Sequence, residues 1–322
     1  MKIHVANRSS YYSRKIGPGH QLNGKPSCHI PVLAAEVISQ LRPAYGQTIV
    51  DGTLGGGGHA LMLAQAVGST GCVVALDRDP VALKRAEQEL KGQPIKVCCS
   101  DYSELPEVLD AAGIPLVDGV VLDLGLSSDQ LDDETRGFSF ESQCPLDLRF
   151  NQEEGVPAWK LIDRLSEKHL ADLIYRYGEE RLSRRIARQI IAARNADPVR
   201  RADQLSRLVR SCYPRGGRDS RIHPATRTFQ ALRIAVNNEL RSLELALERI
   251  PDRLRPQGRI AIISFHSLED RPVKQAFQND PRLAPVFSKP IRPSPREVNE
   301  NPRSRSAKLR VAERTEIVSH AR

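Results

Sequence analysis

Apolar residues along this chain follow two alternating patterns, short continuous runs and longer runs with helical spacing. The short runs are rich in β-branched residues and predict strands at 48–51, 72–77, 95–99 and 119–124. The longer runs predict helices at 32–41, 59–67, 80–91 and 103–112. Strands that alternate with helices indicate an α/β fold with a parallel, doubly wound sheet, and strands this apolar fit a sheet covered on both faces.

The next strand-like run, at 258–265, follows a gap too long for a single crossover helix. We therefore predict a helical domain inserted at 132–225, with the sheet domain at 29–131 and 226–322. A helical run at 228–250 would return the chain to the sheet. A last strand is expected at 307–314, after a stretch rich in proline and arginine from 281 on in which we expect little regular structure. The expected helices of the insert read PAWKLIDRL, KHLADLIYRYG, EERLSRRIARQIIAAR and ADQLSRLVRSCY.

The positive charge of the chain is distributed unevenly. Its net charge is +9, yet residues 181–227 hold thirteen arginines and three aspartates, a local charge of +10 that leaves −1 for the remainder. This favours a polyanionic partner for the insert. Residues 1–28 are expected to form a disordered basic tail, with a transit peptide or an RNA-contacting arm as alternatives.

The cysteines and the lengths of the apolar runs indicate the compartment. The six cysteines form no CxxC motif, and several lie in apolar runs. We interpret them as free thiols in a reducing, cytoplasmic environment and expect no metal site. No stretch reaches 18 apolar residues, so we expect no membrane span.

Four consecutive glycines, 55–58, lie between the first strand and the next helix. A turn of this kind lets the backbone approach a nucleotide closely. Asp77 ends the second strand, where an acid would bind ribose hydroxyls of NAD or of S-adenosylmethionine. Asp51 ends the first strand, and its carboxylate would repel a pyrophosphate but attract the cationic groups of S-adenosylmethionine. A methyl donor is favoured, and a dinucleotide or a purely structural turn remain alternatives.

Further polar residues follow the later strands. Tyr102, which comes after Asp101 and the third strand, could cover an adenine ring. Asp123 ends the fourth strand, where it would face the ligand or cap the following loop. The sequence SFHSLED at 264–270 places Ser, His and Glu at the same edge, although no GxSxG motif supports a hydrolase.

Several longer motifs resemble one bacterial family, the small-subunit (16S) ribosomal RNA cytosine-N4 methyltransferases (the RsmH/MraW family). The similarity runs from residue 29 to 314. It implies a Rossmann-like class I S-adenosylmethionine-dependent methyltransferase with an inserted helical, RNA-binding domain. The motifs are HIPVLAAEV, DGTLGGGGH, ALDRDP, LDLGLSSDQLDDETRGFSF, PLDLR, YGEERLSRRIARQI, HPATRTFQALRI, ISFHSLEDR and NPRSRSAKLRVAER. The cofactor contacts it implies are Gly57, Gly58, His59, Asp77, Tyr102, Asp123 and Gln130.

The resemblance also implies the reaction and the partner. The reaction is N4-methylation of a specific cytidine in the decoding centre (P site), and the partner is small-subunit ribosomal RNA within the assembled subunit. Asp123 is the candidate catalytic residue, because its carboxylate could accept a hydrogen of the cytidine amine; alternatively it serves only the cofactor. Tyr102 stands where the family has phenylalanine, which keeps an aromatic face, and Gly56 stands where a basic residue is common.

The arginines of the insert are the candidate RNA contacts. Arg184, Arg185 and Arg188 share one predicted helix face with Arg181, whereas Leu182, Ile186 and Ile190 line another. Arg215 and Arg218 lie in a glycine-containing basic stretch at 213–227. The alternative is a solvated charged face with local ion pairs.

Two other functions fit parts of the sequence. One is a non-catalytic ribosome-assembly or RNA-binding factor with a retained cofactor pocket. The other is an NAD-dependent oxidoreductase, against which Asp51 and the arginine-rich insert argue.

Overall fold

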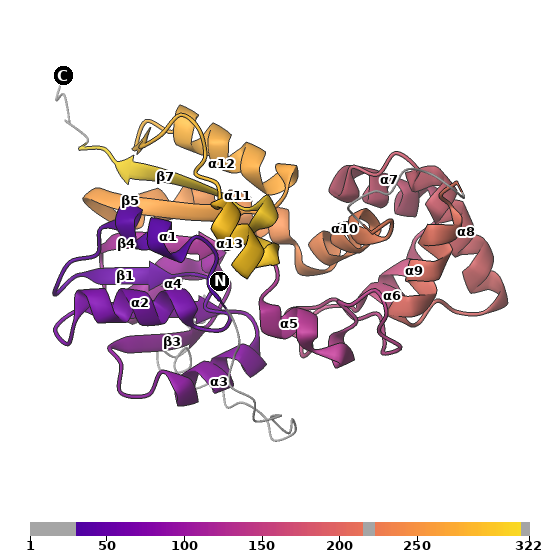
Figure 1. The fold of residues 1–322 in the computed structure, drawn as a ribbon, viewed down its shortest axis with the longest axis horizontal. Helices are drawn as coiled ribbons and strands as arrows, with labels where there is room; N and C mark the ends of the chain where they lie inside the picture. Colours follow the sequence, from indigo (N-terminus) through magenta and orange to yellow (C-terminus); the bar gives the residue numbers. More distant parts are fainter. Residues whose placement is uncertain (1–29, 215–222, 317–322) are drawn as a thin grey trace, which may run out of the picture. The chain divides into compact units, whose positions relative to one another are not determined.

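The computed structural model of this protein describes residues 30–214 and 223–316 (Figure 1). The chain divides into two compact units, the first formed by the residues up to 127 and from 241 on, the second by residues 128–240. The predicted basic tail at 1–28 lies outside the described residues. The second unit extends beyond the predicted insert at both ends, so the residues just before 132 and just after 225 belong to it.

The first unit contains a seven-stranded sheet with the order β3-β2-β1-β4-β5-β7-β6. β1 to β5 are parallel, whereas β7 is antiparallel to both β5 and β6. This confirms the predicted doubly wound α/β sheet. The strands are β1 Thr48–Asp51, β2 Cys72–Asp77, β3 Ile95–Cys99, β4 Val117–Asp123, β5 Leu254–Ser264, β6 Leu283–Pro285 and β7 Lys308–Arg314.

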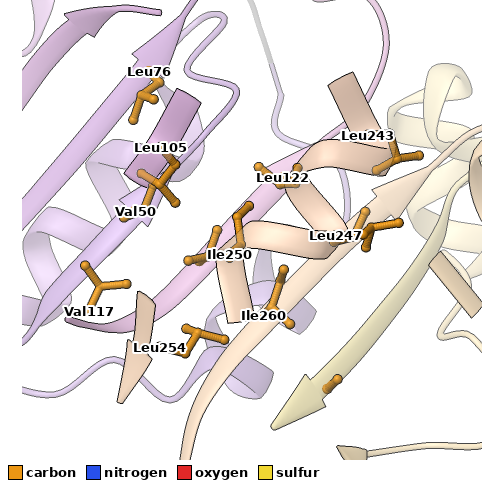
Figure 2. Packing of buried hydrophobic residues seen from close by; sticks show 14 of the residues in the cluster. Val50, Leu76, Leu105, Val117, Leu122, Leu243, Leu247, Ile250, Leu254 and Ile260 are labelled. Atoms are coloured by element: carbon orange, nitrogen blue, oxygen red, sulfur yellow. The ribbon is translucent and has the colours of Figure 1, made fainter. Parts of the chain in front are cut away.

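Helices cover both faces of this sheet, because successive strand residues point to opposite faces. Val50, Val120 and Leu122 pack on one face with α4, α11 and α12, as Figure 2 shows for part of this cluster. Ile49 and Val121 pack on the other face with α1, α2 and α3. The helices are α1 Ala34–Leu41, α2 Gly58–Val67, α3 Pro80–Glu89, α4 Leu105–Ala111, α11 Glu239–Arg249 and α12 Ser267–Asn279.

The strand order reverses beside β1. The chain runs from β1 outward to β2 and β3, then returns to place β4 and β5 on the other side of β1. In such sheets a ligand binds outside the carboxyl ends of the strands at this switch point. Asp51 and Asp123 end the two strands that flank it, with Asp51 in register with Val121.

The second unit consists of helices. The predicted helices of the insert all form, and the predicted run at 228–250 is divided into two helices at Asn238. Asn238 adopts a left-handed conformation with φ 52°, and its amide still donates to the Ile234 carbonyl, which ends α10. The helices of this unit are α5 Ser128–Asp132, α6 Ala158–Arg164, α7 Glu167–Gly178, α8 Ser183–Ala196, α9 Ala202–Ser211 and α10 Thr226–Asn237.

The stretch after residue 281 is more regular than we predicted. β6 pairs with β7, the short helix α13 (Pro295–Glu300) follows, and a 3-10 turn spans Pro302–Ser306. Ser294 begins α13 by accepting the amide of Glu297 at 3.1 Å, and Pro295 suits the first position of a helix. Pro295 and Pro302 therefore mark the starts of regular elements and not a lack of structure.

No helix within residues 30–214 and 223–316 is both long enough and apolar enough to span a bilayer.

Candidate functional site

The glycine turn lies between β1 and α2 and uses the conformational freedom of glycine at two positions. Gly55 has φ 48° and Gly57 has φ 78°, both in the left-handed region that glycine adopts without strain. The Gly57 amide donates to the Leu54 carbonyl at 2.7 Å, which closes the turn. Gly57 caps α2 with no side chain. Gly57 therefore satisfies none of the amides at the start of α2, and the one contact from a side chain is that of the Ala60 amide with the Asp51 carboxylate.

Asp77 ties this turn to the end of β2. One carboxylate oxygen accepts the Gly55 amide at 2.7 Å and the other accepts the Asp79 amide at 2.9 Å. Burial raises the pKa of Asp77 to about 6, and the nearby charge of Asp79 adds to the rise. Asp77 thus lies at the predicted place, and it also fixes the turn, a role that the sequence did not predict.

His59, the second residue of α2, is buried between two groups. Its Nε2 lies 3.1 Å from the Val32 carbonyl oxygen, which can only accept, so Nε2 carries a proton and donates. Its Nδ1 lies 3.9 Å from Asp123 Oδ2. Pro31 lies against Gly58, where an added Cβ would come within 3.0 Å of the proline ring. The predicted residues Gly57, Gly58, His59 and Asp123 therefore lie close together.

Asp51 and Asp123 place two carboxyl groups at the switch point, the first buried and the second partly exposed. Asp51 is 1% exposed, and its Oδ1 accepts the Thr53 amide at 3.1 Å. Burial raises its pKa to about 7; amides of Thr53 and Ala60 and the Thr53 hydroxyl oppose this, whereas the charge of Asp77 adds to it. The pKa of Asp123 is raised well above its usual range by burial and then by the charges of Asp51 and Glu269.

Asp123 has one oxygen with no protein partner. Its backbone amide donates to Thr53 Oγ1 at 2.6 Å, which fixes the end of β4 against the turn. Its Oδ1 is buried and accepts no hydrogen bond from a described residue. A buried carboxylate oxygen without a partner is costly, and a bound cationic or hydrogen-donating group would relieve that cost.

Tyr102 follows β3 and packs against the core of the first unit. It forms part of a short 3-10 helix begun by Asp101, whose Oδ1 accepts the Ser103 amide at 2.8 Å. The other oxygen of Asp101 lies 3.3 Å from Arg78 and 3.1 Å from the Ser242 hydroxyl. Asp101 is thus engaged within the protein. An added Cβ on Gly52, which follows Asp51, would lie 3.1 Å from Tyr102 Cβ, so this ring begins beside the end of β1.

The SFHSLED stretch forms a local cap and not a hydrolase triad. Glu269 is buried and accepts the amides of Phe265 at 2.9 Å and His266 at 3.3 Å, which begins α12. Its Oε1 lies 3.0 Å from His266 Nε2. Glu269 also contributes to the raised pKa of Asp123, an influence that the sequence analysis missed.

The buried acids make a prediction for stability. Asp51→Asn keeps an acceptor for Thr53 but removes a charge whose ionisation the fold opposes. Because the folded-state pKa of Asp51 is raised to about 7, its contribution to stability is complete only below the unfolded pKa and is lost as pH rises through 7. The variant should gain about 2 kcal/mol more in free energy of unfolding at pH 8 than at pH 5. Urea unfolding at both pH values measures this, with Asp172→Asn, at an exposed position of α7, as control. An equal gain at both pH values would contradict the electrostatic explanation.

Gln130 and the predicted RNA contacts belong to the second unit. Gln130 lies in α5, and its role at the cofactor stays a prediction. Arg184, Arg185 and Arg188 are exposed on α8. Arg215 and Arg218 lie outside the described residues.

The apolar face of α8 lies as predicted. Ile186 and Ile190 are fully buried, which leaves the arginine face free to meet a partner. Arg188 lies 3.5 Å from Glu167, and both side chains are largely exposed, so this pair is weak. Arg184 and Arg185 form no ion pair with any described residue. Arg181 and Leu182 precede α8 and so are not on the predicted helix faces, and tertiary packing brings Glu167 from α7 to the arginine face.

The described residues contain no cluster of three or more His, Cys, Asp or Glu side chains suited to hold a metal ion. The carboxyl groups at the switch point are instead arranged around backbone amides and one imidazole.

Comparison with known proteins gives one family and a consistent set of relatives. Residues 26–315 match the model of the MraW methylase family. The chain is 50% identical over 299 residues to Ribosomal RNA small subunit methyltransferase H of Rhodopirellula baltica, covering 89% of this chain and 92% of the relative. It is 49% identical over 287 residues to the protein of the same name from Deinococcus radiodurans, covering 89% of each chain.

Solved structures resemble this chain more distantly. An rRNA methylase from Streptococcus thermophilus aligns with a TM-score of 0.41 and 12% identity, covering 88% of this chain and 94% of that chain.

Proposed function

Because this chain belongs to the MraW methylase family, we propose that it methylates N4 of a specific cytidine in the decoding centre of 16S ribosomal RNA. It is a methyltransferase for small-subunit ribosomal RNA, and S-adenosylmethionine is its methyl donor. The choice of base and atom rests on the sequence motifs that resemble the cytosine-N4 enzymes. The assembled small subunit, and not free RNA, is the proposed substrate.

One observation supports the cofactor site above the others: three carboxyl groups that are buried or only partly exposed surround the glycine turn. Asp51, Asp77 and Asp123 all have raised pKa values, with burial as the largest cause. S-adenosylmethionine carries a sulfonium and an ammonium group, so its net charge is positive. A cationic ligand compensates buried carboxylates, whereas the pyrophosphate of NAD would be repelled by them. The residues present therefore fit the methyl donor better than a dinucleotide.

Each residue at this edge has a proposed role. Asp77 holds the turn and binds the ribose hydroxyls through its remaining lone pairs, as acids do at the end of the second strand. Asp51 attracts the positive charge of the ligand. Tyr102 covers the adenine ring, and the Gly58 amide at the start of α2 binds a polar group of the ligand, whereas the Ala60 amide is engaged by Asp51. Gln130 is a further proposed contact.

Asp123 is the proposed acceptor for the cytidine amine. The bound S-adenosylmethionine supplies an electrophilic methyl group. The exocyclic amine is a weak nucleophile, because its lone pair is conjugated with the ring, so alignment with the methyl group is essential. The unpartnered Oδ1 of Asp123 accepts an amine hydrogen and orients the lone pair. The raised pKa of Asp123 makes its carboxylate a better proton acceptor, and His59 lies beside its other oxygen.

The second unit is the proposed RNA-binding unit. A stacked cytidine cannot reach the site, so it must be unpaired or flipped out. Arg184, Arg185 and Arg188 then bind phosphates around it. Replacing all three by Ala should lower the slope of log affinity against log salt by about 2 on single-stranded RNA. Filter binding of a small-subunit RNA fragment measures this slope. Lysine at the same three positions keeps the positive charge, so this variant should retain most of the salt dependence of the parent. A slope unchanged in the alanine variant would exclude these contacts.

Cofactor affinity should depend on pH in a defined window. Asp77 and Asp51 titrate near 6 and 7 in the ligand-free protein, and their ionised forms bind the cation. Affinity for S-adenosylmethionine should therefore rise at least tenfold from pH 5.5 to 7, with proton uptake by the buffer on binding. Calorimetry in two buffers of different ionisation enthalpy tests this. S-adenosylhomocysteine, which lacks the sulfonium charge, should show a smaller rise, and Asp51→Asn should flatten the dependence for both ligands.

The reaction is tested with methyl-labelled S-adenosylmethionine and small subunits from cells that lack the methylation. Transfer of label to the RNA is expected. Cofactor binding without any transfer would instead favour a non-catalytic assembly factor that kept its pocket.

A further inference from the structure

A segment of the first unit has an excess of positive charge that the proposed function does not yet use. Residues 286–306 contain five Lys or Arg and two Glu, a net charge of +3. Both glutamates are already engaged. Glu297 accepts the Leu33 amide at 2.7 Å, and Glu300 accepts Arg296 Nε at 2.8 Å. The positive charges of this segment are therefore poorly compensated.

Three of these cations are free to meet a partner. Lys289, Arg292 and Arg305 are exposed, and none forms an ion pair or a side-chain hydrogen bond with a described residue. Phe287 comes shortly before Lys289 and Arg292 in the sequence and is 46% exposed, which is unusual for a large aromatic side chain. Exposed cations together with an aromatic ring are typical of surfaces that bind single-stranded nucleic acid.

The register of the sheet places this segment at the edge where the site lies. Asp123 on β4 is in register with Ile263 on β5, and Ile263 with Leu309 on β7. Leu309 forms a bridge to Ile291, with the two amide-to-carbonyl hydrogen bonds at 2.9 Å. Asp123 and Ile291 thus stand in one row, three strand spacings apart, or about 14 Å at about 4.8 Å each. Arg292 follows directly.

The other end of the segment returns to the same edge. Arg305 comes three residues before Lys308, which is in register with Ser264 at the carboxyl end of β5. The helix α13, which Figure 1 labels, lies between Ile291 and Arg305 in the sequence. The free cations therefore flank one edge of the sheet and are not spread over the unit.

The segment is also held in place. Asn301 is 9% exposed, and its side-chain amide donates to the Ile30 carbonyl at 3.0 Å. Together with the contact from Glu297 to Leu33, this fixes the 286–306 segment against residues 30–33. Those residues in turn contact the glycine turn and His59. Cations on a fixed backbone lose less conformational entropy when a ligand binds.

We propose that Lys289, Arg292 and Arg305, with Phe287, form a second RNA-contact surface on the methyltransferase unit itself. It binds the single-stranded RNA that presents the target base, with the cations on the phosphates and Phe287 against a base. The inference rests on the proposed function for its choice of RNA as the polyanion. It implies that residues of the methyltransferase unit contact the RNA substrate in addition to the arginines of the second unit.

The test compares two triple variants that each remove three positive charges. Lys289→Ala, Arg292→Ala and Arg305→Ala remove the proposed contacts. The matched control replaces Lys91, Lys96 and Arg255, which are exposed residues at or near the start of β3 and β5, the opposite edge of the sheet. Binding of a single-stranded small-subunit RNA fragment is measured between 50 and 200 mM salt, together with affinity for S-adenosylmethionine.

The first variant should bind the RNA 10- to 100-fold more weakly at low salt, with a slope lower by about 2 for three contacts on single-stranded RNA. The control should stay within about twofold of the parent, and both should keep cofactor affinity. Lysine at 292 and 305 should retain binding.

RNA affinity equal to that of the control would overturn the proposal, and a loss seen only with assembled subunits would assign the surface to a ribosomal protein instead. The RNA measurement needs no turnover, so a parent protein that transfers no methyl group would refute the proposed function and leave this result separate.

Discussion

Asp77→Ala is expected to weaken binding of S-adenosylmethionine about 100-fold. The substitution removes the acid proposed to bind the ribose hydroxyls, and hydrogen bonds to a charged group contribute about 1.5–3 kcal/mol each. It also removes the acceptor for the Gly55 and Asp79 amides, which lie 2.7 and 2.9 Å from its oxygens. The glycine turn therefore loses both its ligand contact and its anchor. Isothermal titration calorimetry of the purified variant measures the affinity.

Asp77→Asn separates these two contributions. The amide keeps one acceptor oxygen but turns a donor toward one of the two backbone amides, so affinity should fall by a similar factor while the melting temperature falls less than in the alanine variant. Asp110→Asn, at an exposed position of α4, is the control and should bind as the parent does. If Asp77→Ala bound S-adenosylmethionine with unchanged affinity, the assignment of Asp77 to the ribose would be wrong.

Asp123→Asn is expected to lower kcat by 10²- to 10⁴-fold, the range for loss of a proton-accepting group. Asparagine has nearly the same shape, and its oxygen still accepts a hydrogen bond, but it cannot take a proton. Burial and the charges of Asp51 and Glu269 raise the pKa of Asp123, and asparagine lacks that basicity. Single-turnover methyl transfer to small subunits, with saturating cofactor, measures the chemical step.

The same variant distinguishes the two roles considered for Asp123. If it accepts the amine hydrogen, cofactor affinity should change only a few-fold while kcat falls. If it serves only the cofactor, affinity should fall and kcat at saturation should persist. A second variant, Glu269→Gln, tests the same assignment, because it removes a charge that raises the pKa of Asp123. The pH profile of kcat should then shift to lower pH.

The sheet and its helices could be predicted because local patterns and tertiary structure agree there. The run CVVALD forms a strand because its β-branched residues fill a sheet buried on both faces. The division of 228–250 was not predictable from apolar spacing, since Asn238 is tolerated within helices and only its left-handed backbone ends α10. After 281, β6 depends on pairing with β7, a contact that no local pattern encodes, whereas α13 begins at a local cap formed by Ser294.

The candidate site was predictable to the extent that strand ends converge at one edge. Asp51, Asp77 and Asp123 each end a strand, so the fold brings them together. Asp51 and Asp77 accept amides from residues only two positions along the chain, whereas other contacts of the site come from distant segments and were not predictable. Val32 meets His59, and Thr53 supports the Asp123 amide across 70 residues. The arginines after residue 281 are evident in the sequence, but their place at the edge of the sheet was not predictable, because it depends on the pairing of Ile291 with Leu309 of β7.

The central claim is tested most directly by identifying the methylated nucleoside. Small subunits that lack the modification are incubated with the protein and methyl-labelled S-adenosylmethionine, and the digested RNA is analysed by mass spectrometry. We predict a single labelled product, N4-methylcytidine, at one position in the decoding centre, which is lost with Asp123→Asn. Label in another nucleoside, or label that is insensitive to Asp123, would contradict the account.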